Sequence, residues 1–213
     1  MHLAEWGEQL ERIVPEPPSW LFTCEGSPFD CRLLLVGTNP ARNTGKPFWR
    51  NYWSKETGQK QGALLTDLAM FPRHRGTGAP LGWTKTRAKI EGFRGLVRTK
   101  IFEANVYKRN TERANDLQIT DQREEEMFRF ILKTIEPTLL VAHGDDAFGF
   151  FSGMCDTLIK KSGAIQQFYW DTVRSKFVYC RHFAMVRNDE FDQLIAVVNE
   201  QFVESRRPAA PPA

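Results

Sequence analysis

Four polar side chains each follow a short apolar run, and their types limit the chemistry that the chain can perform. They are Asn39, Asn105, His143 and His182. Amides both donate and accept hydrogen bonds, and an imidazole can stabilise a developing anion by donating to it. No Ser, Cys or carboxylate nucleophile stands beside a base, and neither a Walker loop nor a G-x-G-x-x-G motif occurs. These residues favour recognition of a neutral, hydrogen-bonding ligand over covalent catalysis.

The apolar runs before these residues are continuous rather than alternating, which is typical of strands buried on both faces. They lie at 32–36, 100–104, 138–142 and 176–180. Helices are predicted at 64–70, 122–135, 145–161 and from Asn188 and Asp189 onward. Strands that alternate with helices indicate βαβ units, whose ligands bind at the carboxyl ends of the strands. We therefore expect an α/β fold, a three-layer αβα sandwich with a four-stranded, mainly parallel sheet.

Length and composition indicate one domain and a short tail. With 213 residues, 41% of them hydrophobic, the chain can bury a core over 1–205, and the Pro- and Ala-rich end at 206–213 is expected to be disordered. No apolar run approaches the ~18 residues of a membrane span. The N-terminus lacks the blocks of a secretion signal. We expect a cytoplasmic, bacterial-type or nucleoid-associated protein, with its four unclustered cysteines as core thiols.

The net charge of +3 hides an uneven distribution. Residues 73–109 hold ten basic against two acidic side chains, a net of +8, and the remainder holds 19 basic against 24 acidic ones, a net of −5. Such asymmetry favours a surface that binds a polyanion, most commonly nucleic acid, although a merely solvated surface remains the alternative. The segment begins in a Gly- and Pro-rich stretch, 73–83, that is predicted to be a loop. The candidate phosphate contacts here are Arg73, Arg75, Lys85 and Arg87.

Gly37-Thr38-Asn39-Pro40, followed by Thr44-Gly45-Lys46-Pro47-Phe48-Trp49, resembles the first motif of the uracil-DNA glycosylase superfamily. The closest versions belong to the mismatch-specific and single-strand-selective branches. The strand that ends at Asn105 and the segment from His182 to Asn188 are similar, in the same order, to later motifs of that family. The resemblance covers about 32–202. It departs at Ala41, at His143 and at 183–186, where the Pro and Ser of the family's DNA-wedging loop are replaced.

The resemblance implies a glycosylase that removes uracil or a related deaminated base from DNA by flipping the base out of the helix. Asn39 would orient the attacking water, and His182 would stabilise the departing base. Base binding would fall to Gly37, Phe48, Trp49 and Asn105. Arg187 would contact DNA. A monomer acting on single- or double-stranded DNA is expected, with no metal and no cofactor.

Two other interpretations remain open. A catalytically inactive nucleic-acid-binding or interaction protein on the same fold would explain the altered segment after His182. An unrelated metal-dependent α/β hydrolase could use His143 with Asp145 and Asp146. We interpret that acidic pair instead as the cap of the helix that follows it.

Overall fold

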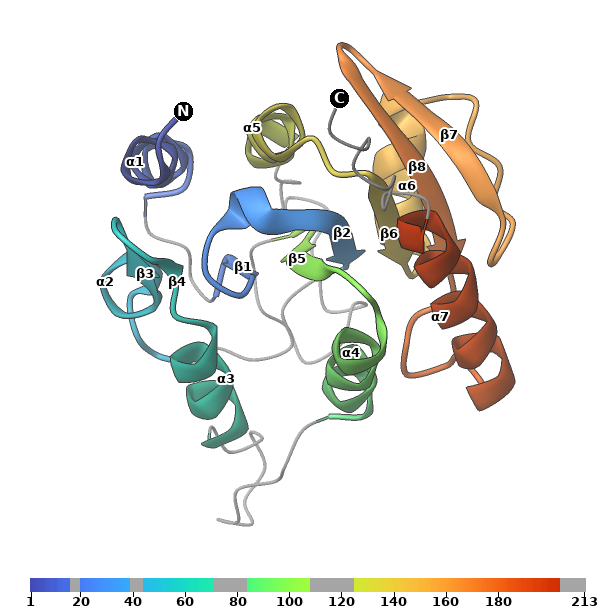
Figure 1. The fold of residues 1–213 in the computed structure, drawn as a ribbon, viewed down its shortest axis with the longest axis horizontal. Coiled ribbons are helices and arrows are strands. Elements are labelled where there is room, and N and C mark those ends of the chain that lie inside the picture. Colours follow the sequence, from blue (N-terminus) through green and yellow to red (C-terminus); the bar gives the residue numbers. More distant parts are fainter. Residues whose placement is uncertain (16–19, 39–43, 71–83, 108–124, 204–213) are drawn as a thin grey trace, which may run out of the picture.

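A computed structural model of the chain describes residues 1–15, 20–38, 44–70, 84–107 and 125–203. Its centre is a mixed six-stranded sheet in the order β1-β5-β2-β6-β8-β7 (Figure 1). In that order the strands are Phe22–Thr23, Lys100–Asn105, Cys31–Gly37, Leu139–His143, Val173–Cys180 and Ile165–Trp170. The four central strands are parallel, and β1 and β7 pair antiparallel at the two edges. A separate hairpin joins β3 (Trp53–Ser54) to β4 (Gly58–Gln59).

The α/β class and the four parallel strands are confirmed, but the prediction omits the two edge strands, β1 and β7. β1 has only two residues, too few for a pattern of its own. Of the six residues of β7, only Phe168 is buried, because an edge strand packs less of its surface than a central one. Its sequence therefore lacks the continuous apolar run by which the four central strands are recognised.

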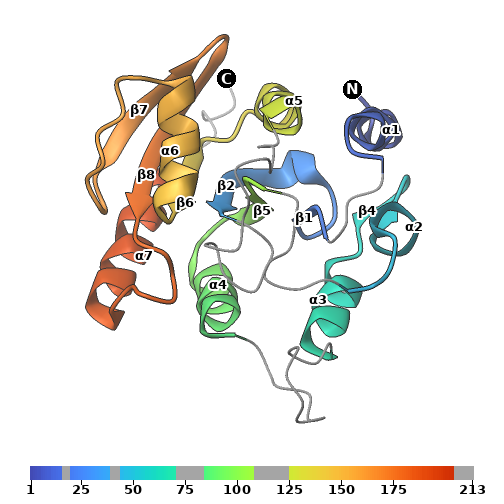
Figure 2. The ribbon, with the colours of Figure 1, turned by 180° about the vertical axis from the view of Figure 1, so that it is seen from behind.

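Helices cover both faces of the sheet, as Figures 1 and 2 show. On one face lie α1 (Leu3–Ile13), α5 (Glu125–Ile135) and α6 (Asp145–Met154). On the other lie α4 (Lys85–Leu96) and α7 (Asn188–Val203). The short helices α2 (Phe48–Tyr52) and α3 (Gln61–Met70) lie beyond the β1 edge, and a 3₁₀ turn, Pro28–Asp30, leads into β2. The sheet therefore contributes to a hydrophobic core on each side.

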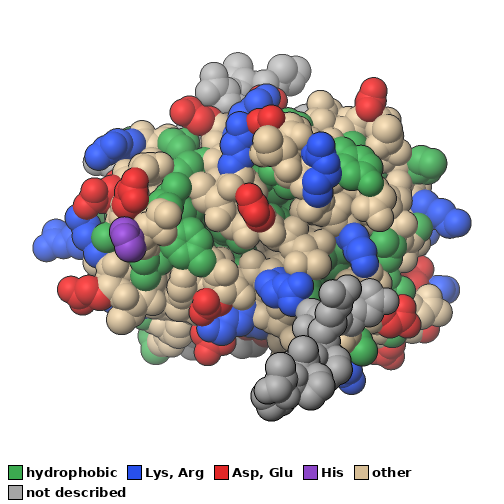
Figure 3. All heavy atoms as spheres, turned by 45° about the horizontal axis from the view of Figure 1, so that its top comes forward, with side chains coloured by type: hydrophobic (Ala, Val, Ile, Leu, Met, Phe, Trp, Pro, Cys, Tyr) green, Lys and Arg blue, Asp and Glu red, His purple; other side chains and the backbone are tan. Residues whose placement is uncertain are grey.

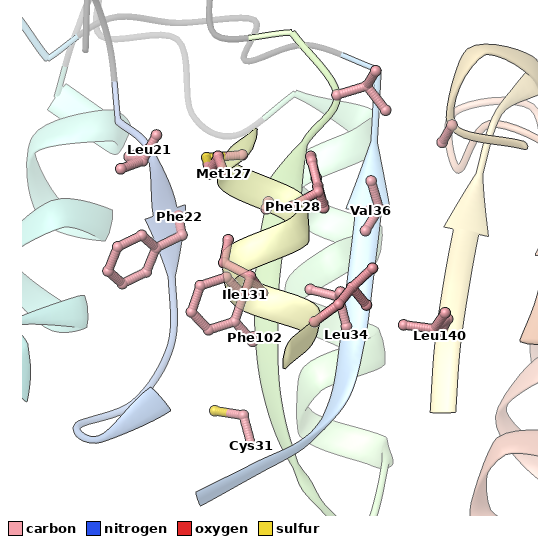
Figure 4. Packing of buried hydrophobic residues seen from close by; sticks show 14 of the residues in the cluster. Leu21, Phe22, Cys31, Leu34, Val36, Phe102, Met127, Phe128, Ile131 and Leu140 are labelled. Atoms are coloured by element: carbon pink, nitrogen blue, oxygen red, sulfur yellow. The ribbon is translucent and has the colours of Figure 1, made fainter. Parts of the chain in front are cut away.

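The packing of strand β2 on both of its faces explains why its sequence is apolar without interruption. Leu34 and Val36 point toward the α5 side, and Leu33 and Leu35 belong to the core under α4 and α7. All four side chains are fully buried. On the α5 side, Figure 4 shows Met127, Phe128 and Ile131 of α5 over β5 and β2, beside the stacked rings of Phe22 and Phe102, whose centroids are 4.8 Å apart. Helix α5 is therefore anchored by the apolar stripe that predicts it.

The predicted helices are present with altered bounds. Within the described residues α5 and α7 match their predictions. Helix α3 begins at Gln61, three residues before its predicted start, and α6 ends at Met154 because Cys155 is extended. The sequence does not predict helices α1, α2 and α4; α4 begins where Thr84 Oγ1 accepts a hydrogen bond from the Arg87 amide. The predicted loop at 73–83 and the tail at 206–213 lie outside the described residues. None of the described helices is long and apolar enough to cross a membrane.

Candidate functional site

The carboxyl ends of the parallel strands bring four residues into one row. Asn105 ends β5, Gly37 ends β2, His143 ends β6, and His182 follows β8. Gly37 is the registered partner of Asn105, and His143 is the partner of Cys180, two residues before His182. We call Gly37, Asn105, His143 and His182 the strand-end cluster. Their order across the sheet follows directly from the strand order β5-β2-β6-β8.

Gly37 allows the neighbouring side chains to approach each other. A Cβ atom at this position would lie 2.6 Å from Nε2 of His143 and 2.9 Å from Oδ1 of Asn105. Both separations are shorter than real Cβ contacts, so any larger residue here would displace the imidazole or the amide. The absence of a side chain at Gly37 is therefore a condition for the close approach of Asn105 and His143 to the end of β2.

His143 is buried and uncharged. Its side chain is 3% exposed, and burial, followed by the charges of His182 and Arg87, lowers the imidazole pKa to about 3. The ring stacks on Phe183, with centroids 4.7 Å apart and an angle of 19° between the planes. Its Nδ1 atom is buried and has no hydrogen-bond partner among the described residues. A neutral imidazole keeps one donor and one acceptor, so one hydrogen-bonding position is unused.

Asn105 has the same property at its amide nitrogen. Nδ2 is buried without a hydrogen-bond partner in the described part of the chain. Buried polar groups are usually paired, and an unpaired one costs about 1–3 kcal/mol. Two of the buried atoms without a described partner therefore lie at the ends of β5 and β6, on either side of Gly37, where a ligand could reach both.

His182 is the more accessible imidazole of the cluster. Its ring centroid lies 5.5 Å from that of His143, with the planes tilted by 51°. Burial lowers its pKa from the ordinary value, so at neutral pH it is also uncharged. Gly144, which has φ +102°, faces this region: a Cβ there would lie 3.7 Å from Cδ2 of His182. A tight turn follows, in which the Met185 amide donates to the His182 carbonyl at 2.7 Å.

The cluster therefore combines one amide with two neutral imidazoles. Such groups form hydrogen bonds with an uncharged, planar ligand that carries both donors and acceptors. They provide no positive charge with which to hold a phosphate or carboxylate. They can donate N–H groups to an oxygen on which negative charge develops.

Phe48, which was predicted to stack on a base, is a core residue in this structure, and Trp49, with the same predicted role, is half-buried against that core. Phe48 is 1% exposed, and its ring packs edge-on against Phe22 with centroids 4.9 Å apart. Trp49 donates its indole N–H to the Val14 carbonyl at 2.8 Å. The stacking role predicted for Phe48 is corrected accordingly, because burial leaves its ring no open face, whereas that of Trp49 stays a prediction.

Arg87, predicted to contact DNA, is instead part of a buried ion-pair cluster. We call Arg87, Glu91 and Arg94 of α4, together with Glu103 of β5, the ion-pair cluster. The Arg87 side chain is 12% exposed and donates to both Glu103 and Glu91. Glu103 is buried and also accepts from Arg94 Nη2 at 3.1 Å. Two of the basic residues that make 73–109 positive therefore compensate buried carboxylates and are not available to a polyanion.

The remaining predicted DNA contacts are only partly described. Lys85 is exposed at the start of α4. The Arg187 side chain is 70% exposed and pairs with Asp189 at 3.2 Å. Asn39, Arg73 and Arg75 lie outside the described residues. On the face that Figure 3 brings forward, which includes the α1 and α5 side, basic and acidic side chains are interspersed.

The proposed metal site at His143, Asp145 and Asp146 is not formed. Asp145 accepts hydrogen bonds from the Tyr179 hydroxyl at 2.6 Å and from Lys160 at 2.8 Å. The described residues contain no group of three His, Cys, Asp or Glu side chains placed to hold an ion. The predicted cap is also corrected: Gly144 is the N-cap of α6, and the two aspartates lie in its first turn, where the helix dipole favours negative charge.

Sequence reasoning singled out Asn105 and His182 but gave His143 no role in base binding, and it did not identify Gly144 or Phe183. A signal for His143 was present, because an imidazole directly after a buried strand occupies the ligand-binding edge of an α/β sheet. Comparison with protein-family models gives no match, and comparison with curated protein sequences gives none either.

Proposed function

We propose that the protein is a DNA glycosylase that hydrolyses the N-glycosidic bond of uracil or a related deaminated base. The observation that carries this proposal is the strand-end cluster, where the uncharged side chains of Asn105, His143 and His182 meet and two buried polar atoms have no hydrogen-bond partner within the described ranges. The motif order along the chain supports it. The architecture proposed with it is a three-layer αβα sandwich whose four parallel strands carry the site.

Recognition of the base is assigned to Asn105. Oδ1 would accept from N3–H of uracil, and Nδ2 would donate to O4, which satisfies the amide nitrogen that is now unpaired. Cytosine presents the reverse pattern at these two positions. A fixed amide would therefore leave unpaired groups against cytosine and discriminate against it.

Hydrolysis is assigned to a water and to His182. Water attacks C1′ of the sugar as the C1′–N1 bond breaks, the bonding electron pair leaves with the base, and the water releases a proton. His182 would donate an N–H to O2 of the departing base, where negative charge gathers. Because its imidazole is uncharged at neutral pH, it donates a hydrogen bond and does not transfer a proton. The predicted role of Asn39 in orienting the water stays a prediction.

DNA is the proposed partner, and the protein is proposed to act as a monomer. Arg187 is the proposed phosphate contact, and its exposure five residues after His182 supports this proposal. Lys85 is the second candidate, exposed at the first residue of α4. Phosphate contacts of this kind position the nucleic acid without reading its sequence.

A non-catalytic nucleic-acid-binding protein is the second candidate. The segment after His182 favours it, since Phe183 and Val186 are buried in the core under α4 and α7, while Ala184 and Met185 between them are exposed. The segment therefore contributes much of its apolar surface to packing. Packing of this segment into the core is compatible with a protein that retains the ligand site but does not catalyse the reaction.

The two candidates are separated by incubating the protein, with chelator present, with single- and double-stranded oligonucleotides that contain uracil, hypoxanthine or xanthine. Alkali then breaks the strand at abasic sites. We expect breaks with the wild type that fall about 100-fold or more in His182→Phe, the loss typical of a missing anion-stabilising donor. His2→Phe, which alters an exposed histidine before α1, is the matched control and should retain full activity. DNA binding without breaks in any arm would identify the non-catalytic candidate.

A further inference from the structure

We propose that His143 and His182 act as a pair, each donating a hydrogen bond to the same carbonyl oxygen of the departing base. The inference rests on the proposed glycosylase function and adds a second catalytic imidazole, buried in the end of β6. The proposed ligand edge is a cyclic imide, in which an N–H lies between two carbonyl groups. Asn105 would take the N–H and the first carbonyl, and the two histidines would take the second.

The two imidazoles come from neighbouring parallel strands. His143 ends β6, and β8 beside it leads into His182 after Cys180, the registered partner of His143. The ring centroids are 5.5 Å apart and the planes are tilted by 51°, so the rings do not lie face to face. The face of His143 is occupied by Phe183 instead. Its polar edge is therefore the part of the ring that remains for a ligand.

His143 is poorly explained as a simple core residue. It is almost fully buried, yet its Nδ1 atom has no hydrogen-bond partner among the described residues. A core position that needs only an aromatic ring is served better by phenylalanine, which leaves no polar atom unpaired. The neighbouring position is also a glycine, Gly37, and a Cβ atom there would collide with Nε2 of this ring. Both observations indicate that the hydrogen-bonding edge of His143 is held in a fixed position in which it can bind a ligand.

The electrostatics suit donation to an anion. Burial keeps both imidazoles uncharged at neutral pH, and each then carries one N–H. A carbonyl oxygen has two lone pairs and can accept from both. The positive charge of Arg87, which acts on His143, also has the favourable sign for an anion at this place. Both histidines keep their protons as the base leaves, and the anionic base is protonated later by solvent.

The chemical test compares two leaving groups. 5-Fluorouracil departs as a more stable anion than uracil, so it depends less on donors at its O2 atom. We expect His143→Phe to lower kcat about 100-fold on a uracil oligonucleotide, as for the loss of one anion-stabilising donor. The loss on 5-fluorouracil should be clearly smaller, and KM should change little on either. An unchanged kcat, or equal losses on both substrates, would overturn the pair.

A measurement on the wild-type chain tests the same pair without substitution and without turnover. With ¹⁵N-labelled histidine, free uracil is added and the imidazole nitrogen signals are followed by NMR. The signals of His143 and His182 should both shift, and those of His2 should stay constant as the internal control. A shift of His182 alone, or of neither ring, would contradict the inference.

The two arms separate the inference from the function on which it rests. Cleavage of uracil DNA with no response of His143 would retain the glycosylase and reject the imidazole pair. Response of both rings to uracil, with no cleavage in any substrate, would reject the glycosylase and retain a paired-imidazole site for a cyclic imide.

Discussion

Strand β5 contributes polar side chains to two buried clusters that solve the same problem in opposite ways. Glu103 enters the ion-pair cluster, where it is charged and accepts from both Arg87 and Arg94. Asn105, two residues later, enters the strand-end cluster, where it is neutral and its Nδ2 has no partner in the described part of the chain. Both clusters lie within a few residues of the same strand end. Each holds a buried nitrogen without a hydrogen-bond partner among the described residues, Arg94 Nε in the first and Asn105 Nδ2 in the second, but the Arg94 guanidinium still pairs with Glu103.

The difference follows from the cost of burial. An unpaired buried charge is strongly unfavourable, so Glu103 can be buried only with partners that supply opposite charge and hydrogen bonds. An amide or a neutral imidazole costs far less when one of its groups stays unpaired. The charged residues here pair with one another, whereas the neutral ones are those that we propose to bind a ligand. From its charge alone, the basic segment 73–109 is predicted to bind DNA. Part of that charge instead stabilises the fold through ion pairs with buried carboxylates.

The largest effect is expected from breaking the ion-pair cluster. Glu103→Leu leaves Arg87 and Arg94 buried without their shared carboxylate and should lower the free energy of unfolding by about 3–5 kcal/mol. Urea denaturation at pH 7 measures this value. Glu200→Leu, on the exposed side of α7, is the matched control and should change stability by no more than about 0.5 kcal/mol. Equal effects of the two substitutions would show that the cluster is dispensable.

Acid should weaken the strand-end cluster through His143. The folded pKa of about 3 lies below the unfolded value of 6.5, so below pH 6.5 the unfolded state binds a proton that the folded state does not. Stability is therefore lost as the pH falls between these values. From pH 7 to pH 5 the His143 contribution is about 2 kcal/mol. The wild type should lose that much more stability than His143→Phe over this interval, and parallel pH profiles would contradict a buried neutral His143.

At pH 7 the same substitution should stabilise the protein. Phenylalanine can keep the stacking on Phe183 and removes the unpaired Nδ1, so His143→Phe should raise the free energy of unfolding by about 1 kcal/mol. Activity should fall at the same time. A gain of stability with a loss of activity would set this cluster apart from the ion-pair cluster, whereas a loss of both would make His143 a structural residue like Glu103.

The smallest effect on stability is expected at Arg187, whose charge is exposed. Arg187→Ala removes only surface pairs with Asp189 and Glu190 and should change stability by about 0.5 kcal/mol or less. If the residue contacts a phosphate, the dependence of DNA affinity on salt should fall by about one unit of slope. Lys55→Ala, which removes another exposed pair, with Glu8, is the control and should leave that slope unchanged. An unchanged slope for Arg187→Ala would remove it from the interface.

The sequence predicts the central sheet because strands buried on both faces must be apolar throughout, as Leu33 to Val36 are. It does not predict β7, where a single buried Phe168 carries no periodic signal. Helix α4 was missed for a related reason. Its charged residues look like a solvated surface in the sequence, and only the fold shows that Arg87 and Arg94 turn toward Glu103.

Asn105 and His182 could be predicted as site residues, because strand ends in an α/β sheet converge on one edge. The same reasoning places His143 at this edge but gives it no role, since the role proposed here rests on the missing Cβ of Gly37 and on an Nδ1 atom without a partner among the described residues. Phe48 shows the converse error. A motif match placed it at a base, and burial against Phe22 places it in the core.

The central claim is that the unpaired polar atoms of the strand-end cluster are held for an uncharged cyclic base. A crystal structure of the wild-type protein with free uracil tests it most directly. The account predicts uracil at the carboxyl ends of β5, β2 and β6, with its N3–H and O4 on the Asn105 amide and its O2 facing His143 and His182. Uracil bound elsewhere, or a site in which Asn105 Nδ2 and His143 Nδ1 remain unpaired beside the bound base, would contradict it.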